Sequence, residues 1–287
     1  MPTLPAANHA PTDAAVPRFA IVRPPSEAYV AALGQVDGVP PIDLALTLAQ
    51  HAAYVAALAD AGVTVHALAP EPHLPDACFV EDTAVVFDGS ALITLPGAPS
   101  RRAEVDAVAH ALGALGLELV HMSPTSAPLA TLDGGDVLRV GATFYVGRSD
   151  RTNVQGIAAL DAFVRARGGR VVEVPLSPEV LHLKCHASAL DPETVLIVEG
   201  LTLPGLAART IAIPRAEAYA ANAVAIGRRV LLSGGYPETL ARVAAAGFEP
   251  VVLGMSELAK AAGSLTCLSV LVGSVGGPVP HDVLRIA

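Results

Sequence analysis

The sequence predicts a mixed α+β fold of the α/β type, in which five repeated units close into a ring around a central pocket. First, a strand-turn-strand-helix-strand (ββαβ) pattern recurs at intervals of roughly 40 to 60 residues, a period typical of propellers and solenoids. Second, hairpins precede the helices, so the sheets contain antiparallel pairs that a purely parallel, doubly wound sheet would not need. Third, the apolar run 268–272 can pair with the first predicted strand, at 19–22, which closes the chain into a five-bladed β/α-propeller.

The composition indicates a globular protein and argues against several classes of partner. Hydrophobic residues make up 52% of the 287 residues and charged residues 16%, which is enough for a sizeable core. The formal charge of -9, with no basic run, argues against nucleic acid and anionic membranes as partners. No signal-peptide pattern and no apolar run of roughly 18 residues, the length that spans a membrane, is found. Because Cys78, Cys185 and Cys267 form no paired spacing, we expect a soluble cytoplasmic protein.

The first unit follows a loose N-terminal tail. Residues 1–17 are rich in Ala, Pro, Thr and Asp without periodicity, so we expect a disordered tail there and a single domain over 18–287. The predicted strand 18–23 is stopped by two prolines, and apolar residues at helical spacing predict a helix over 44–61. A strand over 63–68 completes the unit.

The second and third units repeat the order of hairpin, helix and strand. In the second unit Asp88-Gly89 is a hairpin turn signal, and Ser100 is the predicted N-cap of the helix. The predicted segments of the second unit are strands 79–80 with 83–87, 91–95 and 117–121 and a helix from 100 to 115, and those of the third are strands 135–140, 143–146 and 170–174 and a helix over 153–167.

The fourth and fifth units lead to the closing strand. The predicted segments are strands 181–190 and 194–198 in the fourth unit, whose later part is unclear, and strands 223–226, 229–233 and 250–253 with a helix over 237–246 in the fifth. In a ring of such units, the loops at one end of the central channel converge. Residues far apart in the sequence can therefore share one site.

Cys267 is the candidate nucleophile, because it stands at the start of the closing strand. A thiol in this position can be partly exposed while the strand behind it is held rigid, which suits a reactive centre. The alternative is a small buried apolar residue, since free cysteine is among the most buried residue types.

Two acidic clusters lie at strand starts. Asp76, Glu81 and Asp82 flank an apolar pair, and they form either a solvated loop or buried carboxylates that need a cationic partner. In the second cluster, Asp133 and Asp136 flank two glycines, which either let the backbone approach a ligand or make an ordinary turn.

The remaining candidates are basic residues. His182 begins a probable strand and is either a packed histidine or a catalyst. Its spacing from His186 suggests a metal site, but no convincing third ligand accompanies the pair, so we predict no metal and no cofactor. Arg101 and Arg151 lie near helix starts, where a cation opposes the helix dipole, which indicates a role such as binding a substrate carboxylate. Carboxylates for a guanidinium and arginines for a carboxylate together describe an arginine-like zwitterion, with the thiol aimed at the guanidinium carbon.

A set of motifs in these regions resembles one enzyme family. The motifs are FVED (79–82), LITLPGAPSRR (92–102), TLDGGDV (131–137), RTN (151–153), LHLK (181–184), MSEL (255–258) and LTC (265–267). They resemble the dimethylarginine dimethylaminohydrolase (dimethylargininase) family of the guanidino-modifying (pentein) superfamily, from about residue 19 to 272. The resemblance implies a five-bladed β/α-propeller that hydrolyses asymmetric dimethylarginine and monomethylarginine to citrulline and dimethylamine or methylamine, through a covalent cysteine intermediate and without a cofactor.

The resemblance also implies roles for individual residues. Cys267 matches the nucleophile, His182 the general acid and base, and Asp133 the acidic residue beside them. Glu81 and Asp82 match carboxylates near the guanidinium. The remaining matches are Asp76 near the substrate α-amino group, Arg101 and Arg151 at the α-carboxylate, and Leu33 and Ala261 through their backbone carbonyls.

Two positions bear on the substrate. The family carries an aspartate five residues before the nucleophile, where this chain has Ala262, so one contact to the guanidinium is missing. The superfamily's deiminases and amidinotransferases usually carry His-x-Asp at the catalytic histidine, and the lysine at 184 favours the dimethylargininase branch instead. The alternatives are a thiol hydrolase or deiminase of the same superfamily for arginine, agmatine or citrulline, a cysteine peptidase, and a ring-shaped binding protein. The predicted partners are a small guanidino amino acid and, as an option, a second copy of the chain in a homodimer.

Overall fold

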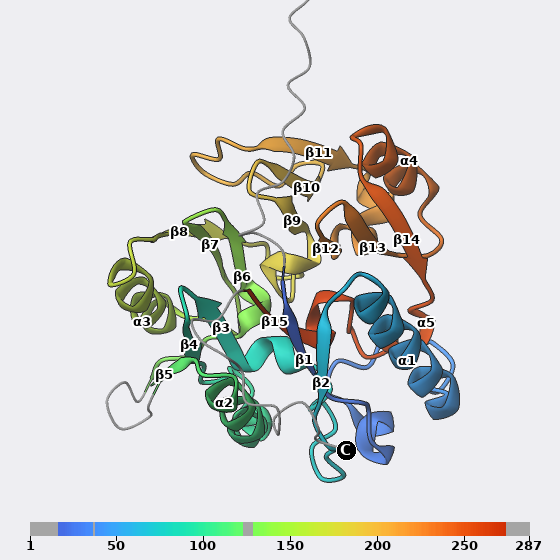
Figure 1. The fold of residues 1–287 in the computed structure, drawn as a ribbon. Coiled ribbons are helices and arrows are strands. Elements are labelled where there is room, and N and C mark those ends of the chain that lie inside the picture. The colour runs from blue at the N-terminus through green and yellow to red at the C-terminus, as the bar shows by residue number, and fades with distance from the viewer. Residues whose placement is uncertain (1–16, 37, 123–128, 274–287) are drawn as a thin grey trace, which may run out of the picture.

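Five three-stranded sheets surround a common centre in the computed structural model, which describes residues 17–36, 38–122 and 129–273 (Figure 1). From the innermost strand outward, the sheets are β15 (Ser269–Val272), β1 (Phe19–Val22) and β2 (Thr64–Ala67); β3 (Ala84–Phe87), β4 (Ser90–Ile93) and β5 (Glu118–His121); β6 (Val137–Val140), β7 (Thr143–Arg148) and β8 (Arg170–Pro175); β9 (Ala187–Asp191), β10 (Thr194–Val198) and β11 (Arg209–Ile213); and β12 (Val224–Ile226), β13 (Arg229–Ser233) and β14 (Glu249–Leu253). The five-bladed propeller predicted from the sequence is confirmed.

Each sheet repeats one topology. The innermost strand is antiparallel to the middle strand, and the middle strand is parallel to the outer one. In the first blade, β15 from the end of the described chain pairs with β1 from its start, and Phe19 lies opposite Val272. This pairing confirms the predicted closure of the ring.

Helices lie on the outside of four blades (Figure 1). They are α1 (Leu44–Asp60), α2 (Val105–Ala114), α3 (Val154–Arg165) and α4 (Pro237–Ala245), and each connects the middle strand of its blade to the outer strand, while the short α5 (Ser256–Ala259) follows β14. The fourth blade connects β10 to β11 without a helix. Its connection contains Pro204 together with Gly200 and Gly205, both at positive φ, and these residues disfavour a helix.

Helix starts were predicted with mixed success. Asn153 caps α3, since its side chain accepts a hydrogen bond from the backbone N–H of Gly156 at 2.9 Å. The predicted cap at Ser100 is wrong, because residues 99–104 form the 3₁₀ helix η4 (Pro99–Glu104) and α2 begins only at Val105. The tighter turn carries Arg101 into the interior, where buried carboxylates hold it.

A 3₁₀ turn precedes each innermost strand, where the sequence had predicted that several of these strands begin earlier. The turns are η3 (Val80–Thr83), η5 (Gly134–Asp136), η6 (Leu183–Cys185), η7 (Arg215–Ala221) and η8 (Thr266–Leu268). Contacts link η7 to η6, η6 to η5, η5 to η3 and η3 to η8, and we call the five turns together the turn ring. Period-2 apolar patterns do not reveal these turns, because buried polar side chains from neighbouring blades hold them in place.

The hydrophobic core consists of five clusters, each between two neighbouring blades. Leu58 of α1 and Leu231 of β13 belong to the cluster between the first and fifth blades, for example, while Leu196 and Leu232 belong to the cluster between the fourth and fifth. All four of these leucines are buried. Because every blade is packed on both sides, the turn ring rests on a rigid frame.

Two further predictions concern the ends of the chain and membrane-spanning helices. The predicted tail, apart from residue 17, and the residues after 273 lie outside the described ranges, so a single domain over 18–287 stays a prediction. No helix in the ranges given above is both long enough and apolar enough to cross a membrane.

Candidate active site

The turn ring brings Cys267, His182, Asp82 and Asp133 to the wall of one pocket, although they come from four blades. The pocket has a volume of about 40 Å³. Its lining residues are Leu33, Gly34, Asp76, Phe79, Asp82, Arg101, Asp133, Arg151, Leu181, His182, Ala261, Ala262, Gly263 and Cys267. Most of the predicted site residues therefore meet in one place, as expected for loops at one end of a central channel.

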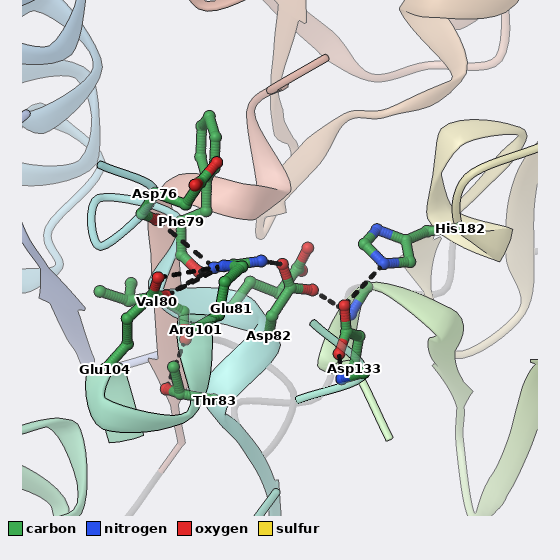
Figure 2. A network of polar contacts seen from close by, with 12 residues as sticks. Asp76, Phe79, Val80, Glu81, Asp82, Thr83, Arg101, Glu104, Asp133 and His182 are labelled. Atoms are coloured by element: carbon green, nitrogen blue, oxygen red, sulfur yellow. Dashed lines mark hydrogen bonds and ion pairs between the residues drawn. The ribbon is translucent and has the colours of Figure 1, made fainter. Parts of the chain in front are cut away.

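His182 and Asp133 form a buried pair (Figure 2). The distance from His182 Nε2 to Asp133 Oδ2 is 3.1 Å, and the backbone N–H of Gly97 donates to Asp133 Oδ1 at 2.8 Å. Burial by itself would lower the pKa of His182, but the charge of Asp82, the hydrogen bond to Asp133 and the charge of Asp136 raise this pKa to about 9. At neutral pH the side chain is an imidazolium that can donate a proton.

Asp82 is a carboxylate held from two sides. Its Oδ2 accepts from Arg101 Nη1 at 2.6 Å, and its Oδ1 accepts from the backbone N–H of Gly135 at 2.9 Å. Burial raises the pKa of Asp82, but the charges of His182 and Arg101 outweigh burial and lower it to about 2. A negative charge is therefore fixed in the pocket wall.

The two glycines of the acidic motif are required for close packing. A Cβ on Gly135 would lie 2.5 Å from Nδ1 of His182 and 2.8 Å from Oδ1 of Asp82, and a Cβ on Gly134 would lie 2.1 Å from the carbonyl oxygen of Glu81. Neither glycine has a positive φ. The glycines thus form a turn that lets the histidine and the carboxylate approach the backbone.

Cys267 lies in η8, half-buried at the mouth of β15. Burial raises the pKa of its thiol well above the ordinary range, and the carboxylates of Glu81 and Asp82 raise it further. The free protein therefore holds a neutral thiol, which a cationic group in the pocket would help to deprotonate.

Most N–H donors of the Arg101 guanidinium bond to other groups of the protein (Figure 2). Its Nε and Nη2 donate to Glu104, and Nη2 also approaches the carbonyl oxygens of Phe79 at 3.0 Å and Asp76 at 3.4 Å. Nη1 has a single partner in the described chain, Asp82. The predicted role at a substrate carboxylate is therefore left to one remaining N–H of this guanidinium.

Arg151 is differently placed. Among the residues that the structure describes, its guanidinium forms no hydrogen bond or ion pair. It lines both the small pocket and an outer cavity of about 620 Å³, whose wall also includes Ser100 and Glu179. Arg151 thus stands where the pocket opens, with its donors available to a ligand.

Asp76, Leu33 and Ala261 also line the pocket, and Leu33, like Arg151, lines the outer cavity as well. Both oxygens of Asp76 accept from the backbone N–H of Leu33, at 3.1 and 3.2 Å. Gly34 packs so closely that a Cβ there would lie 2.7 Å from the carbonyl oxygen of Ala261. The predicted contacts of the Leu33 and Ala261 carbonyls with substrate stay predictions. Ala262 follows with φ 55°, a left-handed conformation that is uncommon for alanine.

Glu81 is the predicted site residue that does not line this pocket. It faces the opposite side of the turn ring, where Lys184 Nζ lies 2.6 Å from Oε1 and Thr266 Oγ1 lies 2.6 Å from Oε2. Successive residues of a tight turn point in different directions, so Asp82 lines this pocket while its neighbour Glu81 does not.

Two supporting carboxylates, Asp136 and Glu104, were not among the predicted site residues. Asp136 is fully buried and accepts from the backbone N–H of Leu183 at 3.0 Å, which anchors the turn after His182. Glu104 holds Arg101, and burial, only partly offset by the charge of Arg101, raises the pKa of Glu104 to about 7. The spacing of Glu104 three residues after Arg101 was the available signal.

Asp82, Asp133 and His182 also have the geometry of a metal-ligand group, since one ligand atom from each lies within 4.8 Å of the others. Their chemistry favours another use. His182 is an imidazolium without a free lone pair at neutral pH, and Asp82 is paired with Arg101. His186, half of the histidine pair considered from the sequence, is not in this group.

Comparisons with known proteins agree on one family. A family model for eukaryotic N,N dimethylarginine dimethylhydrolase matches residues 41–199. The N(G),N(G)-dimethylarginine dimethylaminohydrolase of Streptomyces coelicolor is 43% identical over 231 residues, which cover 80% of this chain and 87% of that protein. A cysteine-to-serine mutant of the Pseudomonas aeruginosa enzyme, complexed with citrulline, has a TM-score of 0.83 at 31% identity and covers 89% of this chain and 99% of its own. A histidine-to-glycine variant of a dimethylarginine dimethylaminohydrolase, as an adduct with S-methyl-L-thiocitrulline, gives the same scores and coverage.

Proposed function

Since this chain belongs to the dimethylarginine dimethylaminohydrolase family, we propose that its pocket hydrolyses Nω-methylated L-arginine to L-citrulline and methylamine or dimethylamine. The observation that carries the proposal is the convergence of a thiol, a buried imidazolium and a fixed carboxylate on one small pocket. At its opening lies Arg151, whose guanidinium has no partner among the residues that the structure describes. The related solved enzymes hold citrulline and a thiocitrulline adduct, which supports this substrate class.

Charge placement suggests how the substrate lies. Arg151 offers its guanidinium to the α-carboxylate, assisted by the remaining N–H of Arg101. Asp76, which also lines the pocket, would bind the α-amino group. Asp82 and Asp133 face the substrate guanidinium and restrict its rotation, which places the guanidinium carbon near the sulfur of Cys267.

Binding activates the nucleophile. The thiol is neutral in the free protein, because burial and two carboxylates raise its pKa. A substrate guanidinium adds a positive charge beside the sulfur and lowers the thiol pKa, so the proton is released to solvent and a thiolate forms. Only a pocket that contains its cationic substrate therefore contains the reactive form.

Two proton transfers by His182 complete the reaction. The thiolate forms a C–S bond to the guanidinium carbon, His182 donates its proton to the methylated nitrogen, and the C–N bond breaks to release the amine. A covalent S-alkylthiouronium remains. Neutral His182 then takes a proton from water, and the water oxygen bonds to the same carbon. Cleavage of the C–S bond, with loss of the remaining hydroxyl proton to solvent, releases citrulline and restores the thiolate.

The first test is product formation from asymmetric dimethylarginine, with arginine and agmatine in parallel. We expect citrulline and dimethylamine in equal amounts from the methylated substrate. We also expect Cys267→Ser to lose nearly all turnover while it keeps the wild-type fold, measured by circular dichroism. Retention of more than a few per cent of the wild-type rate by this variant would contradict covalent catalysis through Cys267.

A second candidate is a related thiol hydrolase or deiminase for another guanidino or ureido compound. The observation that favours it is Ala262, which lines the pocket with a methyl group where a carboxylate would hold the guanidinium. Turnover of arginine, agmatine or citrulline with silence on methylarginines would select this candidate. A cysteine peptidase would be selected only by cleavage of a peptide substrate. A ring-shaped binding protein predicts that an electrophile labels Cys267 no faster than Cys185.

Location and assembly are further proposals. Cys78, Cys185 and Cys267 are all free thiols, which supports a reducing, cytoplasmic compartment. A homodimer stays a prediction, and the mass of the protein in solution, measured by light scattering, tests it directly.

A further inference from the structure

A second cavity lies behind the candidate active site, in the centre of the propeller. Its volume is about 270 Å³, and its walls come from the innermost strands β3, β6, β9, β12 and β15 (Figure 1). The two cavities have no lining residue in common. The turn ring separates them.

The turn ring is a wall only one turn thick. Asp82, Asp133 and Cys267 line the catalytic pocket, and their immediate neighbours Glu81, Gly134 and Thr266 line the central cavity. In the same way, His182 lines the catalytic pocket, and Lys184, two residues later, lines the central cavity. Whatever binds in the central cavity therefore lies beside the backbone of the catalytic residues.

At the polar end of the central cavity, the side-chain ammonium group of Lys184 pairs with the carboxylate of Glu81. Glu81 is 9% exposed, and Lys184 Nζ lies 2.6 Å from its Oε1, while Thr266 Oγ1 lies 2.6 Å from its Oε2. A buried carboxylate of this kind needs a cationic partner. Lys184 provides the partner from a flexible stem that itself lines the cavity, so a free ion of the same chemistry can take its place.

The remaining walls suit methyl groups. They include Ala84, Val86, Val137, Ala189, Val224 and Ala225. The other charged residue of the lining is Arg139, which is exposed; its guanidinium stacks over Phe87 at 4.7 Å and its Nε donates to the carbonyl of Gly141. An ion with one polar N–H face and small alkyl groups matches this cavity better than a metal ion does.

We propose that the central cavity is a second small-molecule site, selective for alkylammonium ions, with Glu81 and Thr266 as its polar end and Lys184 as its resident occupant. That its ligand includes the amine product rests on the proposed function. Dimethylammonium in this site would inhibit turnover without competing with the methylarginine substrate, because the two ligands occupy cavities with separate walls.

The test measures binding of ¹³C-dimethylammonium by NMR titration to protein whose Cys267 has been alkylated. Alkylation fills the catalytic pocket and makes the measurement independent of turnover, so failure of the proposed function leaves this result unaffected. We expect dimethylammonium to bind the alkylated protein and the neutral analogue dimethyl ether not to compete with it. Loss of binding on alkylation would place the amine in the catalytic pocket and overturn the proposal.

Two variants locate the ion. Ala225→Leu fills the central cavity and is expected to weaken binding at least tenfold, whereas the matched control Ala212→Leu, on the exposed side of β11, leaves binding unchanged. Lys184→Met removes the resident ammonium and is expected to tighten binding at least tenfold, which keeps the test decisive if Ala225→Leu does not fold. Equal binding by the wild type and Lys184→Met, or by folded Ala225→Leu and Ala212→Leu, would contradict the assignment.

Discussion

At the scale of single residues, the protonation of His182 couples the site to stability. Its pKa rises from 6.5 to about 9 in the folded protein, because the effects of the surrounding carboxylates exceed that of burial. A raised pKa stabilises the folded state fully below pH 6.5, and this contribution is lost as the pH rises through 9. The same protonation supplies the general acid of the proposed reaction.

We therefore expect the free energy of unfolding to fall between pH 6.5 and pH 9, measured by urea denaturation across this window. The matched control is His182→Asn, which does not titrate and should show a smaller fall. Equal falls in the two proteins would mean that other groups account for the pH dependence.

The two predicted carboxylate-binding arginines should respond oppositely to substitution. Arg101→Ala leaves the carboxylates of Asp82 and Glu104 buried without a cation, which should destabilise the fold by about 3 to 5 kcal/mol. Arg151→Ala should leave the free energy of unfolding unchanged and raise KM, because in our proposal its guanidinium binds the substrate and no group of the described protein. Thermal unfolding and steady-state kinetics of both variants check this contrast, and a stable Arg101→Ala with only a raised KM would contradict it.

At the scale of elements, the hairpins and the four long helices could be predicted from periodicity and turn signals. The 3₁₀ turns could not, since Asp82 and Asp136 bend the chain through contacts with distant residues rather than through local preference. The later part of the fourth blade stayed unclear for another reason: its proline and glycines were visible, but the repeat alone did not say what replaces a helix. The direction in which Glu81 points depends on the turn, so it was also beyond the sequence.

Helix capping gives a test at this scale. Asn153→Ala should lower the free energy of unfolding by about 1 kcal/mol, because its side chain satisfies the N–H of Gly156 at the start of α3. Ser100→Ala should have almost no effect, since Ser100 lies inside η4 and caps nothing. Urea denaturation of both variants measures this difference. Equal losses of the free energy of unfolding would show that η4 behaves as the first turn of α2.

At the scale of the whole molecule, the resemblance of the motifs to one family and the closure of the ring were predicted correctly. The gathering of Cys267, His182, Asp82 and Asp133 followed from the propeller, because such a ring brings equivalent loops to one end of the channel. The sequence did not indicate which N–H donors of Arg101 remain free, because this depends on the buried position of Glu104.

The five interblade clusters predict that the ring unfolds as a unit. Leu196→Ala, in the cluster between the fourth and fifth blades, should lower the free energy of unfolding by about 2 to 5 kcal/mol. Loss of secondary structure and exposure of the Cys267 thiol should then share one midpoint in urea. Separate midpoints would show that the fourth blade opens independently of the blade that carries the thiol.

The alternation of residues across the turn ring limits how this wall can change. Substituting one side chain alters one cavity, whereas inserting a single residue before Thr266 would move the following side chains of η8 by one position. The hydroxyl of the threonine would then take the place of the thiol in the catalytic pocket, and the thiol would take the place of Leu268, which lines neither cavity. The spacing of residues within these short turns therefore determines which side chains reach the substrate, just as much as the identity of the residues does.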